Sequence, residues 1–263
     1  PLPAETLESH LAALRQLVDM GVDIIQNHNM RLLAGAETNS TETRERFGFE
    51  TKYRLIHGDA GEYRAPDGTV IRVFEYEESL RSTTTMSEDD LFYLRKLHFL
   101  VDFCWNIEVY KPLLRTAQAY GVNPVDVLTG VLDAADKGTA PEVAAFFERF
   151  DAMSRDEWFD SAEAIEAHFA DPGQFRRLID QEFEKLNILF SVTLLREAKP
   201  AFDALVEAII RELGTVPEAM LRAAADHAFS LFPSLAEERL PEEIELPENY
   251  LAFDPEAGSD GFV

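Results

Sequence analysis

Between residues 86 and 231, apolar side chains recur every three or four residues, in runs that are separated by proline or glycine. That spacing places the apolar side chains on one face of an α-helix, and short connections favour antiparallel neighbours. The pattern therefore predicts a helical bundle. The clearest predicted faces are Leu91, Leu94, Leu97, His98, Val101 and Trp105, then Phe175, Leu178, Ile179, Phe183, Leu186 and Phe190, then Phe202, Leu205, Val206, Ile209 and Leu213.

Capping signals set several of the expected helix boundaries. Ser87 with Asp90 resembles a capping box, and we expect its helix to run to about Tyr110. Ser154 with Glu157 resembles a second capping box. Further boundary signals are Asn123 before Pro124, Gly214 as a stop, and Pro217 as the start of a last helix through about Leu231.

The N-terminal third carries different patterns. Residues 5–20 predict an amphipathic helix that Gly21 ends in the C′ position, and residues 22–25 read as a short β-branched strand. Helix, glycine turn and strand together predict an α/β unit that feeds a parallel sheet. Residues 53–76 change to a period of two around the turn at 66–68, which predicts an antiparallel hairpin.

These elements predict an α+β fold that is predominantly α-helical. We expect an α/β segment at residues 1–50, a β-hairpin connector at 51–85, a helical domain at 86–236 and an acidic tail at 237–263. An α/β start of one helix and one strand cannot complete a sheet, so we expect its partner strands upstream and the chain to be a fragment.

Charge and cysteine content limit the classes of function. The formal net charge is −25, with no basic cluster, so we expect no binding to nucleic acid. No apolar run approaches roughly 18–20 residues, so we expect no membrane span and a cytoplasmic protein. Cys104 is the one cysteine, so the chain forms no internal disulfide and no cysteine-based metal site.

The densest group of polar side chains follows the predicted strand. Asn27, His28 and Asn29 could read a polar ligand there, because parallel α/β folds bind ligands at the carboxyl ends of strands. Arg31 and Glu37 follow, and Arg31 could pair with a carboxylate of substrate or cofactor. The alternatives are a loop that only satisfies backbone groups and an Arg31 that forms a structural ion pair.

A second polar group lies on the helix after residue 86. His98 and Asp102 share a face, so they could orient a general base or form a buried structural hydrogen bond. Cys104 points elsewhere and reads as buried packing. We assign no catalytic residue and no metal ligand from the sequence.

The chain is similar to a known family in residues 3–6, 8–10, 22–25, 32–38, 44–54 and 86–90, all within about residues 1–110. The family that these residues resemble is that of the cobalamin-binding radical SAM proteins. Residues 3–6 (PAET) resemble the PGET element late in the radical-SAM barrel, with Ala4 where the family has glycine. The predicted strand at residues 22–25 and residues 32–38 (LLAGAET) resemble the next barrel strand and its exit. Residues 44–54 and 86–90 resemble the segments that follow it in that family.

The resemblance implies a function for the intact protein. In that family an upstream domain binds cobalamin, and the barrel holds a 4Fe–4S cluster through a C-x-x-x-C-x-x-C loop. The cluster reduces S-adenosylmethionine to a radical that abstracts hydrogen from a small-molecule substrate, often leading to methyl transfer. This chain would supply a truncated radical-SAM α/β barrel end, followed by the β-hairpin and a C-terminal helical bundle, and would shape the substrate pocket.

The resemblance also implies roles and partners. Asn27, Asn29 and Arg31 become candidates for contacts to S-adenosylmethionine or substrate, and the partners are the upstream barrel and the cobalamin domain. The chain would bind none of these cofactors alone and would not be catalytic alone, since the cluster cysteines are absent. The alternative of a different class is a standalone acidic helical module that binds a protein partner.

Overall fold

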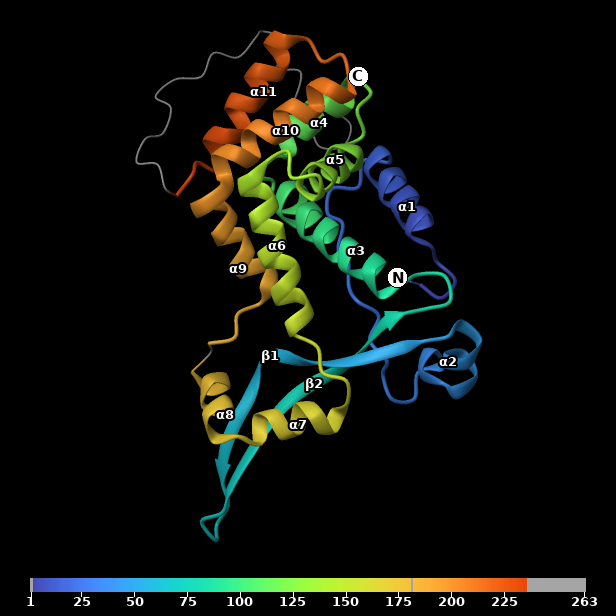
Figure 1. The fold of residues 1–263 in the computed structure, drawn as a ribbon, viewed down its shortest axis with the longest axis vertical. Coiled ribbons are helices and arrows are strands. Elements are labelled where there is room, and N and C mark those ends of the chain that lie inside the picture. The colour runs from blue at the N-terminus through green and yellow to red at the C-terminus, as the bar shows by residue number, and fades with distance from the viewer. Residues whose placement is uncertain (1, 181, 236–263) are drawn as a thin grey trace. The chain divides into compact units, whose positions relative to one another are not determined.

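A computed structural model describes residues 2–180 and 182–235, and this chain forms two compact units, each assembled from several segments (Figure 1). Unit 1 comprises Pro1–Leu7, His28–Leu94 and Phe150–Leu189. Unit 2 comprises Glu8–Asn27, Arg95–Arg149 and the chain from Phe190 onward. The predicted domain division was sequential, at residues 50, 85 and 236, whereas these units are discontinuous in sequence. The predicted acidic tail at 237–263 lies outside the described residues.

Over the described residues the fold is mostly helical, with one antiparallel hairpin, as predicted. The elements of unit 1 are a 3-10 helix (Glu37–Asn39), α2 (Thr41–Phe47), β1 (Glu50–Arg64), β2 (Val70–Ser82), α7 (Ala162–Ala170) and α8 (Pro172–Ile179). Unit 2 contains α1 (Leu7–Asp19) apart from its first residue, a π-helix (Val101–Asn106), α4 (Lys111–Ala119), α5 (Pro124–Asp136), a second π-helix (Leu194–Ala198), α10 (Lys199–Leu213) and α11 (Glu218–Leu231). Residues of α3 (Glu88–Leu100), α6 (Pro141–Asp156) and α9 (Leu186–Thr193) are divided between the two units.

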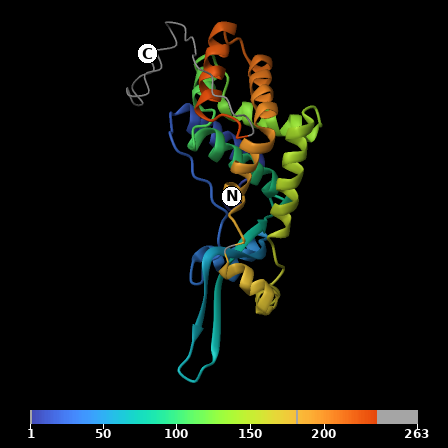
Figure 2. The same ribbon diagram turned by 90° about the vertical axis from the view of Figure 1, so that its left-hand side faces the viewer.

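The hairpin forms where the period-two pattern predicts it and is longer than predicted (Figure 2). Its turn follows from local chemistry. Gly68 has φ +89°, Ala65 N–H donates to Thr69 O at 2.8 Å, and the Asp67 side chain accepts from Thr69 N–H at 2.9 Å. Only glycine adopts that φ without strain, so the Asp-Gly pair sets the turn and the register of both strands.

The core of unit 1 lies between the hairpin and two short helices. Its buried residues are Leu55 of β1 and Ile165, Phe169, Phe175 and Leu178 of α7 and α8. The register of the strands breaks between Leu55 and Ala60, so residues 56–59 form a bulge. Bulges of this kind bend a strand and redirect its side chains.

Unit 2 is a packed group of helices, in agreement with the predicted bundle. In Figure 1, α4 lies beside α11 and α5 lies beside α10, and both pairs are in contact. Aromatic rings fill part of the core: the ring centroid of Phe99 lies 5.8 Å from that of Phe103 and 5.8 Å from that of Phe146. The apolar stripe of α10 is confirmed in part, because Phe202 and Val206 are fully buried whereas Leu213 is exposed.

The predicted strand at residues 22–25 is wrong, and with it the α/β unit. These residues form no strand, since no described strand lies beside them. Two side chains make the backbone hydrogen bonds that a neighbouring strand would otherwise make. Asn106 accepts from Ile25 N–H at 2.9 Å and donates to Ile25 O at 2.9 Å, and Trp105 Nε1 donates to Val22 O at 3.2 Å.

Two helix predictions in the bundle region are also wrong in extent. The face expected from Phe175 to Phe190 belongs to two helices, α8 and α9, because the chain leaves the helix at Asp180 and Phe183 packs against Phe169 of α7. The helix expected to end near Tyr110 changes to a π-helix at Val101 and ends at Asn106. The Ser154–Glu157 capping box does not form, because Ser154 lies near the end of α6.

Several boundary signals are confirmed. Ser87 N–H donates to Asp90 at 2.8 Å and Asp90 N–H donates to Ser87 Oγ at 3.1 Å, which is a reciprocal capping box. The side chain of Asn123 caps α5, and Gly21 follows α1 with φ +78°. No helix within the described ranges combines the length and apolar character needed to cross a lipid bilayer.

Candidate functional site

The predicted site residues lie in the irregular segment between α1 and α2. His28, Arg31 and Glu37 are exposed, and Asn27 and Asn29 are half-buried. Asn27 belongs to unit 2 and the other four belong to unit 1. Within the described part of the chain, no residue hydrogen-bonds to the side chains of Asn27, His28 or Asn29. Those polar groups are thus free to meet a ligand, and their role stays a prediction.

Residues 30–32 run antiparallel along the outer edge of β2 and fix Arg31 there. Leu80 N–H donates to Met30 O at 3.0 Å, and Leu32 N–H donates to Glu78 O at 2.9 Å. Arg31 is thereby paired with Ser79 in a single antiparallel bridge. The backbone of this part of the loop is consequently held by the hairpin.

Glu77 of β2 is a buried carboxylate that two arginines contact. Nε of Arg54, its cross-strand neighbour, donates to Oε1 at 2.5 Å, and Nε of Arg31 pairs with Oε2. Ser79 Oγ donates to Oε1 at 3.2 Å. The exposed fraction is 5% for the Glu77 side chain and 53% for Arg31. A carboxylate this buried needs charged partners, and Arg31 forms the structural ion pair that was the alternative to a ligand contact.

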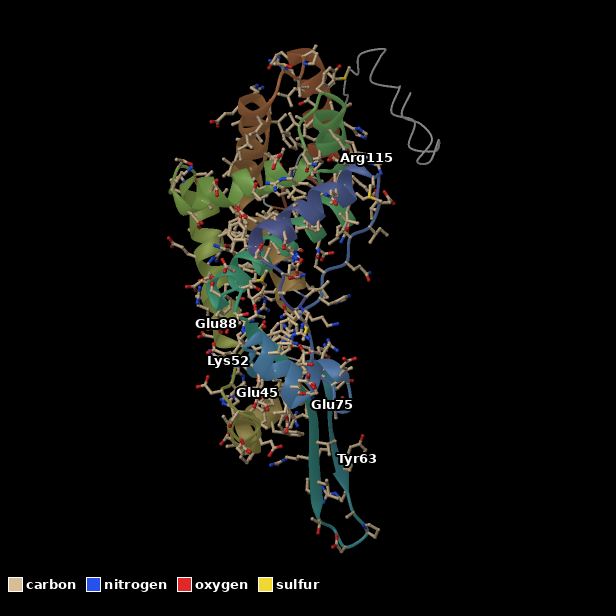
Figure 3. The ribbon with its side chains drawn as sticks, turned by 90° about the vertical axis from the view of Figure 1, so that its right-hand side faces the viewer. Glu45, Lys52, Tyr63, Glu75, Glu88 and Arg115 are labelled. Atoms are coloured by element: carbon tan, nitrogen blue, oxygen red, sulfur yellow. The ribbon has the colours of Figure 1, made fainter. Side chains whose placement is uncertain are left out.

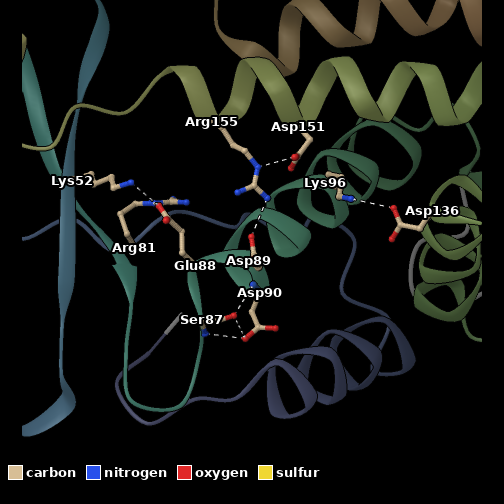
Figure 4. Close-up of polar contacts among 10 residues, drawn as sticks. All are labelled: Lys52, Arg81, Ser87, Glu88, Asp89, Asp90, Lys96, Asp136, Asp151 and Arg155. Atoms are coloured by element: carbon tan, nitrogen blue, oxygen red, sulfur yellow. Dashed lines mark hydrogen bonds and ion pairs between the residues drawn. The ribbon is translucent and has the colours of Figure 1, made fainter.

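Next to Glu77, three arginines and two aromatic rings form what we call the arginine–aromatic ladder. Cζ of Arg54 and Cζ of Arg81 lie 5.1 Å and 4.2 Å from the ring centroid of Trp158. Cζ of Arg81 and Cζ of Arg155 lie 4.4 Å and 4.0 Å from that of Phe92. Their carboxylate partners in Figure 4 are Glu88 for Arg81 (3.2 Å) and Asp89 (3.0 Å) and Asp151 (2.7 Å) for Arg155.

A cavity of about 290 Å³ lies at the bulge of β1, within unit 1. Apolar residues line much of it, and His57, Glu184 and Lys185 add polar groups. Burial lowers the pKa of His57, which favours the neutral imidazole. This volume is near the lower end of small-molecule sites.

The thiol of Cys104 lies in the core of unit 2, among buried polar groups. Lys199 forms an ion pair with Asp203, and Tyr110 donates to the same carboxylate at 2.6 Å. Burial raises the pKa of Cys104, so the thiol stays protonated. One buried thiol does not fit a 4Fe–4S cluster, which needs several accessible thiolates. In the described ranges no three His, Cys, Asp or Glu side chains are grouped to hold a metal ion.

Over residues 2–180 and 182–235, the fold and these polar groups define a mostly helical structure with one hairpin and a buried carboxylate–arginine centre. No family model matches the chain, and no curated protein matches it. The sequence did not point to Glu77, Arg81 or Trp158. A signal was present in the alternation of Glu77, Ser79 and Arg81, which a strand puts on one face, but the predicted strand stopped at Tyr76.

Proposed function

We propose that this chain is the C-terminal part of a cobalamin-binding-type radical SAM enzyme, in which it shapes the substrate pocket. Among the resembling segments, residues 8–10 and 22–25 belong to unit 2, and the observation that carries the proposal is that the other four stretches fall within one compact unit. These stretches are residues 3–6, 32–38, 44–54 and 86–90, and unit 1 contains all of them.

The conformation of Ala4 supports the resemblance. Ala4 has φ +64°, in the left-handed region that favours glycine. The family motif has glycine at this position, so the backbone here has the conformation that would select that glycine. The turn is closed by Glu5 N–H, which donates to Leu2 O at 3.1 Å, and by Leu2 N–H, which donates to the Glu5 side chain at 2.7 Å.

Hydrogen bonds also join the regions around these stretches. Thr84 N–H donates to Phe47 O at 2.9 Å, so the segment before residues 86–90 contacts residues 44–54. Thr85 Oγ1 donates to Glu5 O at 2.7 Å, which joins the same segment to residues 3–6. Residues 3–6 and 44–54 are thus joined through Thr84 and Thr85, which precede residues 86–90.

Because this chain has a single cysteine, the 4Fe–4S cluster would be held by the upstream part of the intact protein. When bound upstream, the cluster and S-adenosylmethionine would supply the radical that abstracts hydrogen from substrate. The role of this chain would be to bind and orient the substrate or S-adenosylmethionine through Asn27, His28 and Asn29. Arg31 already holds Glu77, so its contribution would be to keep the loop in place.

The test uses the intact enzyme with its cluster reconstituted, and the readout is formation of 5′-deoxyadenosine and of product. Asn29→Ala should lower turnover at least about tenfold without changing the thermal unfolding midpoint, as expected for loss of a ligand contact. The control is Gln16→Ala, which removes an exposed amide on α1 and should leave turnover unchanged. Wild-type turnover in Asn29→Ala would remove that residue from the site.

A further inference from the structure

The distal half of the hairpin exposes one apolar face. Tyr63 pairs with Ile71 and Gly61 pairs with Val73, so these side chains share a face. The exposed fractions are 62% for Tyr63, 48% for Ile71 and 43% for Val73, and Figure 3 labels Tyr63 on this part of the ribbon. On the other face, Cζ of Arg72 lies 5.4 Å from the ring centroid of Phe175 in α8, whereas Val70, nearer the turn, is 40% exposed.

The outer edge of β1 is open along the same half. Nearer the core, Phe159 pairs with Tyr53 and covers this edge. Ala65 N–H bonds to Thr69 O, and antiparallel pairs alternate, so the backbone groups of Tyr63 point toward β2. The N–H and C=O groups of Glu62 and Arg64 therefore point outward, and no residue in the described ranges bonds to them.

This edge is complementary to itself. In an antiparallel pair of two β1 edges centred on Tyr63, Glu62 of one copy faces Arg64 of the other, twice. Both residues present outward backbone groups, as a hydrogen-bonded pair requires, and Tyr63 faces its own copy in the closer, non-hydrogen-bonded pair. The edge of β2 lacks this property, because a pairing centred on Arg72 opposes two arginines, and one centred on Ile71 opposes Val70 and Arg72.

We propose that two copies of this chain associate through the β1 edge around Tyr63, forming a four-stranded antiparallel sheet. Opposite charges directly across a strand pair stabilise it, and the two Tyr63 rings remove apolar surface from water. An isolated two-stranded ribbon is marginally stable, so the added strands also stabilise the distal hairpin.

Charge reversal tests the register. Glu62→Arg alone and Arg64→Glu alone each create two like-charge pairs across the interface, and each should lower the association constant of the dimer at least about tenfold in sedimentation velocity. Glu62→Arg also removes the ion pair of Glu62 with Arg72 in its own hairpin (3.3 Å), whereas Arg64→Glu leaves that pair in place. An equimolar mixture of the two variants should restore dimerisation. In the mixed dimer one copy carries arginine at both positions and the other carries glutamate at both, so each cross-strand pair again joins opposite charges. Glu75→Arg, on β2 beside the bulge (Figure 3), is the matched control and should dimerise like the wild type.

A second variant tests the same register through a covalent bond. Cα atoms in a non-hydrogen-bonded antiparallel pair lie about 4.5 Å apart, within the range of a disulfide. Tyr63→Cys should therefore oxidise to a covalent dimer far faster than Glu75→Cys, while the buried Cys104 stays reduced. A monomeric wild type, a dimer that both charge variants retain, or equal crosslinking of the two cysteine variants would each overturn the proposal.

Discussion

The guanidinium of Arg31, in the segment that runs along the outer edge of β2, forms an ion pair with the carboxylate of Glu77 on β2. Arg31, which the sequence suggested as a partner for a carboxylate of substrate or cofactor, thus already binds a carboxylate of its own chain. Because Arg31 is half exposed and Glu77 is buried, the two partners should contribute unequally to stability.

We expect Glu77→Ala to lower the free energy of unfolding by about 3 kcal/mol, since it leaves Arg54 without its buried partner. Arg31→Ala should cost less than about 1 kcal/mol, because its side chain is screened by solvent. Urea denaturation followed by circular dichroism measures both. Equal losses for the two variants would contradict this account of the pair.

The pair of His10 and His98 predicts a pH dependence in unit 2. Their Nε2 atoms lie 2.8 Å apart, and burial lowers the pKa of His98 to about 3. His98 therefore bonds to His10, whereas the sequence suggested Asp102. Between about pH 6.5 and the folded-state pKa, the unfolded chain binds a proton that the folded chain does not, so stability falls as pH falls.

The expected loss attributable to His98 is about 2 kcal/mol between pH 7 and pH 5. His98→Phe should flatten the dependence in that window, measured as the midpoint of urea unfolding at each pH. The control is His28→Gln, which changes an exposed imidazole and should keep the wild-type slope. An unchanged slope in His98→Phe would show that another group titrates.

Cys104 should not react in the folded protein. Its thiol is fully buried and protonated, so thiol reagents should modify it only after denaturation. Reconstitution of this chain with iron and sulfide should give no cluster absorbance. A stoichiometric cluster on the folded chain would contradict the proposed division of chemistry.

The backbone conformation of Gly48, in the turn between α2 and β1, predicts that a side chain at this position lowers stability. It has φ +59°, and an added Cβ would lie 2.8 Å from Cγ2 of Thr84. Gly48→Ala should therefore cost about 1–2 kcal/mol. Gly35→Ala is the matched control for the clash, since Gly35 also has positive φ but nothing within 4 Å of the added Cβ. Gly48→Ala should cost more than Gly35→Ala.

Features that depend on a few neighbouring residues could be predicted from the sequence. The Ser87–Asp90 capping box, the Asp67-Gly68 turn and the Asn123 cap all involve groups within three residues of each other. The strand at residues 22–25 failed because a strand needs a distant partner, and the partner here is the side chain of Asn106.

The candidate site likewise has features that depend on neighbouring residues and features that depend on residues distant in sequence. The polar cluster after residue 25 could be found because its residues are consecutive, and both roles of Arg31 could be stated. The partner of Arg31 could not, because Glu77 reaches it only after β1 and β2 pair. The arginine–aromatic ladder likewise depends on Trp158, which is remote in sequence from Arg54 and Arg81.

The central claim, that this chain is part of a radical SAM enzyme, is tested most directly by the sequence encoded upstream of Pro1. The account predicts a C-x-x-x-C-x-x-C loop within roughly 200 residues, about the length of the rest of a barrel. An upstream sequence without that loop would contradict the claim and favour the alternative of a standalone acidic module that binds a protein partner.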